Sequence, residues 1–101
     1  MDETTDAGSW TFLTNHAHVL LAIAAEPDLR VRDIADRVGI TERAVQRIVT
    51  ELETAGYLEI TREGRRNHYR VIDGQPLRHP AEEHHRIGEL LQVLSHRRRN
   101  R

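Results

Sequence analysis

The chain has 101 residues, 38% of them hydrophobic, and a formal net charge of −1 at pH 7. This length suits one small domain and is too short for two, and the absence of cysteine excludes disulfides, thiolate metal sites and cysteine nucleophiles. No apolar run approaches the roughly 18 residues of a membrane span, and the acidic N-terminus does not resemble a signal peptide, so we expect a cytoplasmic protein.

The net charge hides an asymmetry along the chain. Residues 1–61 contain 5 arginines and 11 acidic residues, whereas residues 62–101 contain 10 arginines and 5 acidic residues. There is no lysine, and arginine is the side chain that best makes forked contacts to phosphate and guanine. Because binding to a polyanion depends on the local field, the near-neutral total does not exclude a nucleic-acid partner.

A first helix is predicted after an acidic tail at residues 1–9. Thr14 is the expected N-cap, and the helix ends before Glu26 and Pro27. Its apolar residues run almost all the way round. This pattern indicates a helix that is buried on more than one side, either by the chain's own core or by a second subunit.

Two more helices, joined by a tight turn, are predicted next. The first covers residues 32–38 and ends at Gly39, which can adopt the left-handed C-cap conformation without steric strain. Thr41 caps the second, which covers residues 42–55 and stops at Gly56. One stripe of this second helix is apolar. The residues on the opposite face are Arg43, Gln46, Arg47 and Thr50.

The periodicity then changes from helical to alternating. Apolar and polar residues alternate in residues 57–62 and again in residues 67–72, which predicts two half-buried strands. The segment between them contains Gly64 and several arginines, so the strands are expected to form a hairpin with a cationic tip. Arginine guanidinium groups favour phosphates and narrow minor grooves.

A loop containing Pro76 and Pro80 is followed by a last helix, predicted over residues 81–96. This helix has an apolar stripe at helical spacing and little core of its own to cover, so we expect the stripe to form a dimer seam. Gly88, in the middle of the helix, would allow another helix to approach closely. The residues expected at the dimer interface are Trp10, Phe12, Leu13, Leu20, Ile87, Gly88, Leu90, Leu91 and Leu94.

The run from Ile34-Ala35 through Val38-Gly39-Ile40 to residues 52–58 carries a resemblance to a known family. Residues 29–71 resemble the winged helix-turn-helix of the MarR and ArsR groups of bacterial and archaeal transcriptional regulators. The resemblance implies a dimer, held by the first and last helices, that reads a pseudo-palindromic operator. A recognition helix would enter the major groove, and a wing would touch the flanking backbone or minor groove.

The polar helix face and the hairpin tip therefore form the expected DNA-binding surface. Arginine pairs with guanine and glutamine with adenine through two hydrogen bonds each, and threonine can reach phosphate or a thymine methyl group. The residues expected to contact DNA are Thr41, Arg43, Gln46, Arg47, Thr50, Arg62, Arg65, Arg66, Asn67 and His68.

These elements predict a mostly α fold with a small β-hairpin (α+β), namely a winged helix-turn-helix with N- and C-terminal dimerisation helices. We expect an acidic disordered tail at residues 1–9, the DNA-binding domain at 10–78, the dimerisation helix at 79–96 and a basic disordered tail at 97–101. The predicted function is a prokaryotic, homodimeric transcriptional regulator, most simply a repressor. Its partners are double-stranded DNA and a second copy, with no membrane, and any small-molecule effector is unassigned.

Two alternatives stay open. The charged face could instead serve a protein–protein assembly module. A metal-responsive regulator is also conceivable, because a helix over residues 81–96 would carry carboxylate and imidazole groups on one face. The candidate ligands are His79, Glu82, His85 and Glu89. Since no tight His-x₃-His pair occurs, we expect no metal and no cofactor. The sequence also lacks a glycine-rich phosphate loop, so we do not expect an enzyme.

Overall fold

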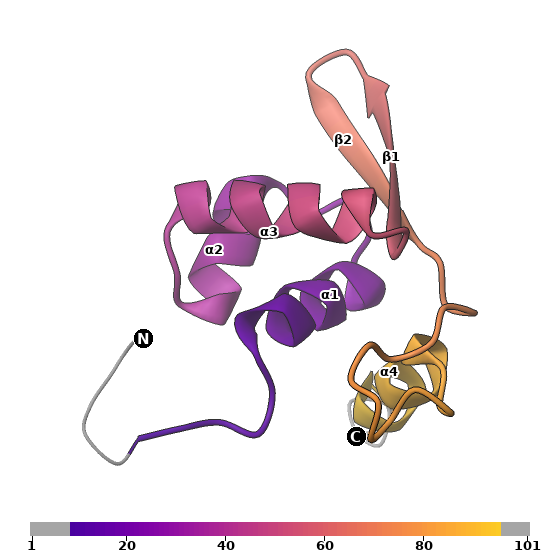
Figure 1. The fold of residues 1–101 in the computed structure, drawn as a ribbon. Helices are drawn as coiled ribbons and strands as arrows, with labels where there is room; N and C mark the ends of the chain where they lie inside the picture. The colour runs from indigo at the N-terminus through magenta and orange to yellow at the C-terminus, as the bar shows by residue number, and fades with distance from the viewer. Residues whose placement is uncertain (1–8, 96–101) are drawn as a thin grey trace.

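The computed structural model describes residues 9–95 of the chain (Figure 1). The elements, in chain order, are α1 (Asn15–Ala25), α2 (Val31–Val38), α3 (Glu42–Thr54), β1 (Leu58–Glu63), β2 (Arg66–Val71) and α4 (Ile87–Ser95). The expected mostly α fold with one hairpin is confirmed. The two tails predicted for residues 1–9 and 97–101 lie outside the described residues, apart from Ser9.

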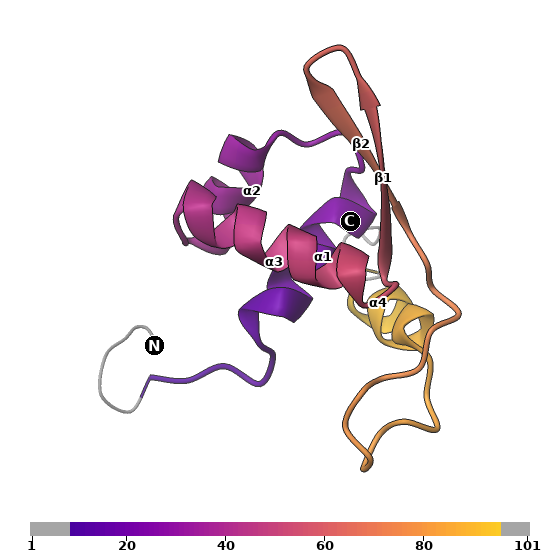
Figure 2. The ribbon, with the colours of Figure 1, turned by 45° about the horizontal axis from the view of Figure 1, so that its top comes forward.

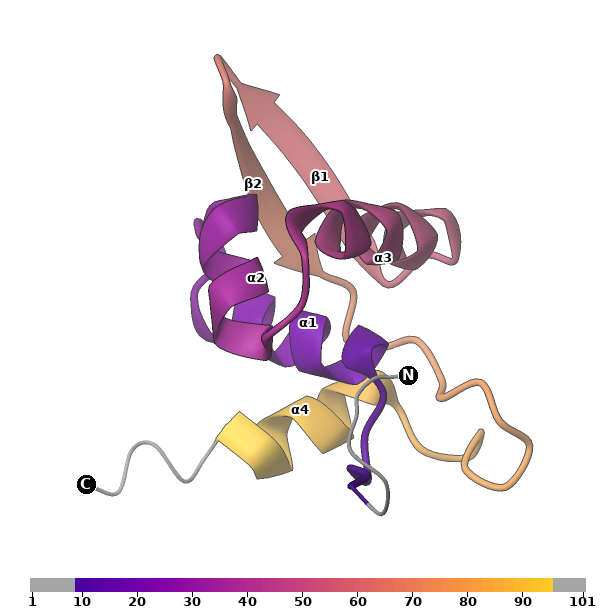
Figure 3. The same cartoon turned by 90° about the vertical axis from the view of Figure 1, so that its left-hand side faces the viewer.

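Helix α1 is the centre of the fold. It contacts α2, α3, α4 and β2, and Figure 3 shows it lying between α3 on one side and α4 on the other. Val19 and Ile23 are fully buried and Leu20 is nearly so, which explains why the apolar residues of this helix surround it. Thr14 caps α1 as predicted, because its hydroxyl accepts a hydrogen bond from the Ala17 N–H at 3.2 Å.

The turn between α2 and α3 follows the sequence prediction closely. At the end of α2, the N–H groups of Gly39 and Ile40 donate to the Ala35 carbonyl at 2.8 and 3.1 Å. Thr41 then caps α3, accepting from the Ala44 N–H at 3.0 Å. The buried Ile34 of α2 packs in the same core as the apolar stripe of α3, so the turn holds two helices whose inner faces meet.

The end of α3 directs the chain into the hairpin. The Gly56 N–H donates to Glu53 and the Tyr57 N–H donates to Leu52, at 3.0 and 2.8 Å, which is the Schellman pattern of a helix C-terminus. Gly56 has a φ of 90°, a left-handed value that favours glycine. A side chain there would also come within 2.9 Å of the Gln75 amide nitrogen. The direction in which β1 leaves α3 therefore depends on Gly56.

The hairpin has the predicted alternation and a tight tip. Leu58 pairs with Val71 at its base and Glu63 with Arg66 at its end, which leaves Gly64 and Arg65 as a two-residue loop. Gly64 has a φ of 62°, as expected for a hairpin turn with glycine at the first central position. Within the described residues, only glycines have a positive φ. Figure 1 shows the hairpin projecting away from the helices.

Helix α4 is shorter than predicted. The sequence predicts a helix over residues 81–96, but residues 80–85 form turns and a bend, and α4 begins only at Ile87. The reason is a pairing that no local pattern reveals, because Pro76 and Arg86 form an isolated antiparallel bridge. The Ile87 N–H donates to the Gln75 carbonyl at 2.7 Å. In a longer helix, this N–H would instead donate to a carbonyl one turn earlier in the same helix.

The position of Gly88 also corrects the prediction. Gly88 lies in the first turn of α4, and its N–H donates to the Asp73 carbonyl at 3.0 Å. A Cβ atom on Gly88 would lie 2.7 Å from the Asp73 Cβ and 2.9 Å from its carbonyl oxygen. The close neighbour is therefore the loop after the hairpin and not another helix.

Within residues 9–95, no helix has the length and apolar character that crossing a bilayer requires.

Candidate DNA-binding surface

Helix α3 presents a polar face to solvent because its opposite face is anchored in the core. Val45 and Ile48 are almost completely buried, and Val49 and Leu52 nearly so. The residues on the outward face, all exposed, are Arg43, Gln46, Arg47 and Thr50. Helical spacing places these side chains on one face of α3. A major groove is wide enough to admit an α-helix, so this face can present its hydrogen-bond donors and acceptors to base edges.

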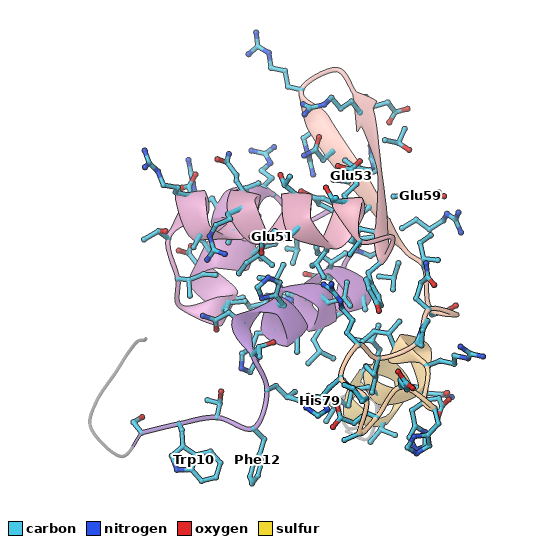
Figure 4. All side chains as sticks on the ribbon, in the orientation of Figure 1. Trp10, Phe12, Glu51, Glu53, Glu59 and His79 are labelled. Atoms are coloured by element: carbon cyan, nitrogen blue, oxygen red, sulfur yellow. The ribbon has the colours of Figure 1, made fainter. Side chains whose placement is uncertain are left out.

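Two residues of α3 link its outer face to α1. The His16 ring lies 2.6 Å from the Glu51 carboxylate, and the Arg47 guanidinium lies 3.5 Å from the same oxygen. The hydrogen bond from His16 holds the pKa of Glu51 below its ordinary value. Figure 4 labels Glu51 on α3. Glu51 therefore stands between a side chain of the central helix and one of the expected base-reading arginines.

The arginines of the hairpin are not equivalent. Arg62 and Arg65 are exposed near the tip, in keeping with the predicted contact surface. Arg66 is half-buried, and its guanidinium donates to the backbone carbonyl of Asp28 at 2.7 Å. Of the three wing arginines predicted from the sequence, Arg66 is thus already bonded within the protein.

His68 is also engaged within the protein. Its Nδ1 lies 2.7 Å from the Asp28 carboxylate and its Nε2 lies 2.8 Å from the Glu63 carboxylate. The hydrogen bond with Asp28, together with the charges of Asp28 and Glu63, raises the pKa of His68 above its ordinary value, against the opposing effect of burial. The fold therefore stabilises the charged form of the ring relative to that of an ordinary histidine.

Two further pairs of polar residues bond within the hairpin, one across its strands and one along β2. Glu59 accepts from Arg70 Nε at 3.1 Å and from a terminal nitrogen of the same guanidinium at 2.6 Å. Asn67, also predicted to contact DNA, is half-buried and donates to the Tyr69 hydroxyl at 3.3 Å. The side chains at the tip that extend into solvent are therefore those of Arg62 and Arg65.

A cleft of about 600 Å³ opens between α1, the C-terminal half of α3 and α4. Its wall is largely apolar and includes Leu20, Tyr57 and Leu90, while His16 contributes an imidazole ring and Arg78 a guanidinium group. Glu51 lines the same cleft, so the contact that links α1 to α3 lies at its edge. We call this feature the α1–α3–α4 cleft.

The residues expected at a dimer interface fall into two groups. Leu20, Ile87 and Leu91 are buried in the chain's own core, because α4 packs on α1 within one molecule. Trp10 and Phe12 are 70% and 90% exposed, and their rings meet edge to face at 4.8 Å. Figure 4 shows both rings pointing away from the helices. Leu94, with Val93 beside it, is exposed on α4, and Leu13, Gly88 and Leu90 are half-buried.

The histidine and glutamate residues near α4 do not share one helical face. Because the chain reaches α4 only at Ile87, Glu82 and His85 lie in turns. His79 Nδ1 accepts from the Ala81 N–H at 2.9 Å, and His85 lies 2.7 Å from Glu89. Among residues 9–95, no group of three such side chains is arranged to hold a metal ion. The geometric argument for a metal-responsive regulator thus disappears with the longer helix.

Comparison with known proteins assigns the fold to a family. The model of the MarR family matches residues 11–66, which is more than half of the chain. The chain belongs to the MarR family. This match decides between the MarR and ArsR groups, and it confirms that the chain is not an enzyme, since MarR-family regulators are non-enzymatic DNA-binding proteins.

Solved MarR-type regulators have the same fold. The PcaV transcriptional regulator from Streptomyces coelicolor, in complex with its natural ligand, is 32% identical, with a TM-score of 0.55 over 81% of this chain and 60% of PcaV. The antimony-specific transcriptional repressor AntR is 26% identical, with a TM-score of 0.54 over 78% of this chain and 61% of AntR. The chain thus spans about three fifths of the length of these regulators.

A more distant structure shows the fold alone. AF1382 from Archaeoglobus fulgidus is 19% identical, with a TM-score of 0.54 over 86% of this chain and 90% of AF1382. None of the curated proteins is a match to this sequence.

Several residues that shape this MarR-type surface escape sequence reasoning. Asp28 bonds to Arg66 and His68, which follow it by 38 and 40 residues, and no local period connects such positions. The contact between His16 and Glu51 spans 35 residues in the same way. The only signal near Asp28 is Pro27, which predicts an extended connection but not what that connection touches.

Proposed function

We propose that this chain is a sequence-specific DNA-binding transcriptional regulator, most simply a repressor, that acts as a homodimer on a pseudo-palindromic operator. The observation that carries the proposal is the exposed face of α3, where Arg43, Gln46 and Arg47 stand on a helix anchored in the core. In this arrangement α3 enters the major groove, and Arg62 and Arg65 at the hairpin tip reach flanking phosphates or the minor groove.

A second copy would cover the apolar groups that one molecule leaves exposed. Trp10 and Phe12, whose rings contact each other, and Val93 of α4 are each at least 69% exposed, so a single molecule leaves large apolar side chains uncovered. Two helix-turn-helix units on a two-fold axis would then read half-sites about one helical turn apart. Concentration-dependent sedimentation of the full chain tests this part of the proposal, and a monomer at all concentrations contradicts it.

The α1–α3–α4 cleft supports a role for a small-molecule effector. PcaV has been crystallised with its natural ligand. In the present chain, the largely apolar wall, the His16 ring and the Arg78 guanidinium suit a small apolar molecule with one acidic group. Such a ligand at His16 would compete with Glu51 for the ring and so alter the contact between Glu51 and Arg47. The effector would thereby act on a base-reading side chain.

The salt dependence of DNA binding tests the function. If the surface binds phosphates, log K falls linearly with log salt, by about 0.9 for each phosphate neutralised. Binding to operator DNA obtained by genomic selection should be much tighter than binding to a mixed-sequence duplex. A wild-type protein that binds no duplex at low salt would instead favour the protein–protein assembly module.

Two variants separate reading of sequence from attraction to the backbone. Arg47→Ala is expected to weaken operator binding by about 1 to 3 kcal/mol while binding to mixed-sequence DNA changes little, because a bidentate contact to guanine is lost. Arg86→Ala is the matched control, since this exposed arginine directly precedes α4, which Figure 3 shows on the other side of α1 from α3. Equal losses on operator and mixed-sequence DNA for Arg47→Ala would show that α3 does not read bases.

A further inference from the structure

The connection between α1 and α2 runs beside the hairpin and bonds to β2. The Tyr69 N–H donates to the Pro27 carbonyl at 3.3 Å, and the Arg66 guanidinium donates to the Asp28 carbonyl at 2.7 Å. The third contact joins side chains, with His68 Nδ1 2.7 Å from the Asp28 carboxylate. Figure 2 shows this connection reaching the hairpin. We call the contacts of Asp28 with Arg66 and His68 the wing brace.

The geometry of His68 requires a charged ring. Carboxylates accept hydrogen bonds and donate none when ionised, and His68 has a carboxylate at each nitrogen, Asp28 at Nδ1 and Glu63 at Nε2. Both contacts are satisfied only when both nitrogens carry hydrogen. A neutral ring has one N–H and must give up one of the two carboxylates. The carboxylates lie on opposite sides of the ring, so they do not converge on a point where a metal could bind.

Other groups around the ring do not provide a substitute anchor. Thr61 is the cross-strand partner of His68, and Arg70, two residues along β2, is bonded to Glu59. Arg66 lies two residues away on the other side. Arg30 and Asp33 line the hollow that Arg66 and Asp28 share. Of the residues facing this hollow, Asp28 is the one that contacts both Arg66 and His68.

We propose that Asp28 is a positioning residue for DNA binding, and that through His68 it holds the wing against the helix-turn-helix in a proton-dependent way. The inference rests on the proposed function, because it concerns where the hairpin tip meets DNA. The base of the hairpin is fixed by buried Leu58 and Tyr69, whereas its outer half has the wing brace as its link to the helices. Loosening the brace lets the tip, with Arg62 and Arg65, depart from the geometry that matches α3.

The direction of the pH effect follows from the sign of the shift. The pKa of His68 is raised in the fold, chiefly by the hydrogen bond with Asp28. A group with a raised pKa contributes fully at a pH below its ordinary value, and the contribution is lost as the pH rises through the folded pKa. The brace is therefore complete at a pH below the ordinary histidine pKa and weakens as the pH rises through the raised pKa of His68, and DNA binding weakens with it.

The test compares two variants that each remove one acidic charge. Asp28→Asn weakens the brace, whereas Asp36→Asn, the control, changes an exposed aspartate of α2. Affinity for a mixed-sequence duplex at low salt is measured between about pH 6 and pH 9, a range that spans histidine titration. We expect Asp28→Asn to weaken binding roughly two- to fivefold at the acid end and to flatten the profile, as for the loss of exposed charged contacts. Asp36→Asn should bind at least as tightly as wild type, because removing a negative charge favours DNA.

A second measurement needs no DNA. NMR titration of the His68 ring, assigned with His68→Gln, should give a midpoint above the ordinary histidine value in wild type and a lower one in Asp28→Asn. The same midpoint in both proteins, or the same pH profile of DNA binding in Asp28→Asn and Asp36→Asn, overturns the inference. If wild type binds no duplex, the proposed function fails, while the titration still decides whether the brace exists.

Discussion

Helix α3 and the hairpin are both polar and exposed, yet they use their polar side chains differently. On α3, the back of the helix supplies the anchorage through Val45 and Ile48, so Arg43 and Gln46 on the front are left to face solvent. On the hairpin, Arg66, His68 and Arg70 bond to neighbouring acidic or carbonyl groups. A two-stranded hairpin has little core, so its charged side chains help to hold it together.

The difference shows that the number of basic residues in a segment does not give the number of side chains that are available to bind a partner. The segment around the hairpin tip contains four arginines between residues 62 and 70, but the structure leaves the side chains of Arg62 and Arg65 extended into solvent. On a helix, by contrast, periodicity alone separates the buried residues from the available ones.

The anchorage of α3 is tested by Ile48→Ala. Ile48 is 1% exposed, and its truncation is expected to destabilise the fold by about 2 to 5 kcal/mol, through lost burial and the cavity left behind. Urea unfolding measures the change. Thr50→Ala, on the outer face of the same helix, is the control and should stay within about 0.5 kcal/mol of wild type. Similar losses for both would mean that the two faces of α3 are not distinct.

The junction between the two regions is tested by Gly56→Ala. The left-handed backbone makes an added methyl group unfavourable, with an expected loss of about 1 to 3 kcal/mol, and the methyl group would also displace the Gln75 amide, which lies 2.9 Å from the added Cβ position. Gly74→Ala is the matched control, because nothing lies within 4 Å of a Cβ atom there. Thermal unfolding of the two variants provides the comparison, and equal stability would show that the junction is not constrained by Gly56.

The inequality of the hairpin arginines is tested with Arg65→Ala and Arg66→Ala. We expect Arg65→Ala to lower the slope of log K against log salt by about one unit, as for one lost phosphate contact. Arg66→Ala should change the slope less, since its guanidinium donates to the Asp28 carbonyl, and its main effect should be a lower affinity from the weakened wing brace. Titration of a mixed-sequence duplex at several salt concentrations gives both slopes. If the two slopes fall equally, Arg66 also contacts phosphate, and the proposed difference between the two arginines is wrong.

The smallest expected effect concerns the link from α1 to α3. The hydrogen bond from His16 lowers the pKa of Glu51, so its stabilising contribution is present above the ordinary glutamate pKa and is lost as the pH falls through the folded value. Glu51→Gln should therefore reduce the dependence of the unfolding temperature on pH in the acid range. Glu53→Gln, another exposed glutamate of α3, serves as the control. A pH dependence identical to wild type in Glu51→Gln would contradict the assigned cause.

Local rules were sufficient for much of this fold. Caps at Thr14 and Thr41 and the glycine in the hairpin turn follow from backbone chemistry over a few residues, and the structure confirms them. The sequence also predicts the apolar stripe of α4. It does not predict the partner of this stripe, because a stripe indicates that Ile87 and Leu91 are covered but not whether α1 or a second molecule covers them.

The failures have a common physical cause. The bridge between Pro76 and Arg86, which delays the start of α4, and the contacts of Asp28 with β2 both join segments that meet only after folding. Such contacts depend on tertiary geometry, which propensity and periodicity do not encode. Among the residues predicted to contact DNA, Arg66, Asn67 and His68 also make contacts within the protein that the sequence does not reveal.

The exposed indole of Trp10 gives the protein a built-in optical reporter. It is the only tryptophan in the chain, and it is in contact with solvent in the single molecule. Emission from an indole shifts to shorter wavelength when water is removed from around it. If a second copy covers this ring, the emission spectrum will change with protein concentration while the backbone stays folded. Fluorescence on unlabelled protein can thus follow association separately from unfolding.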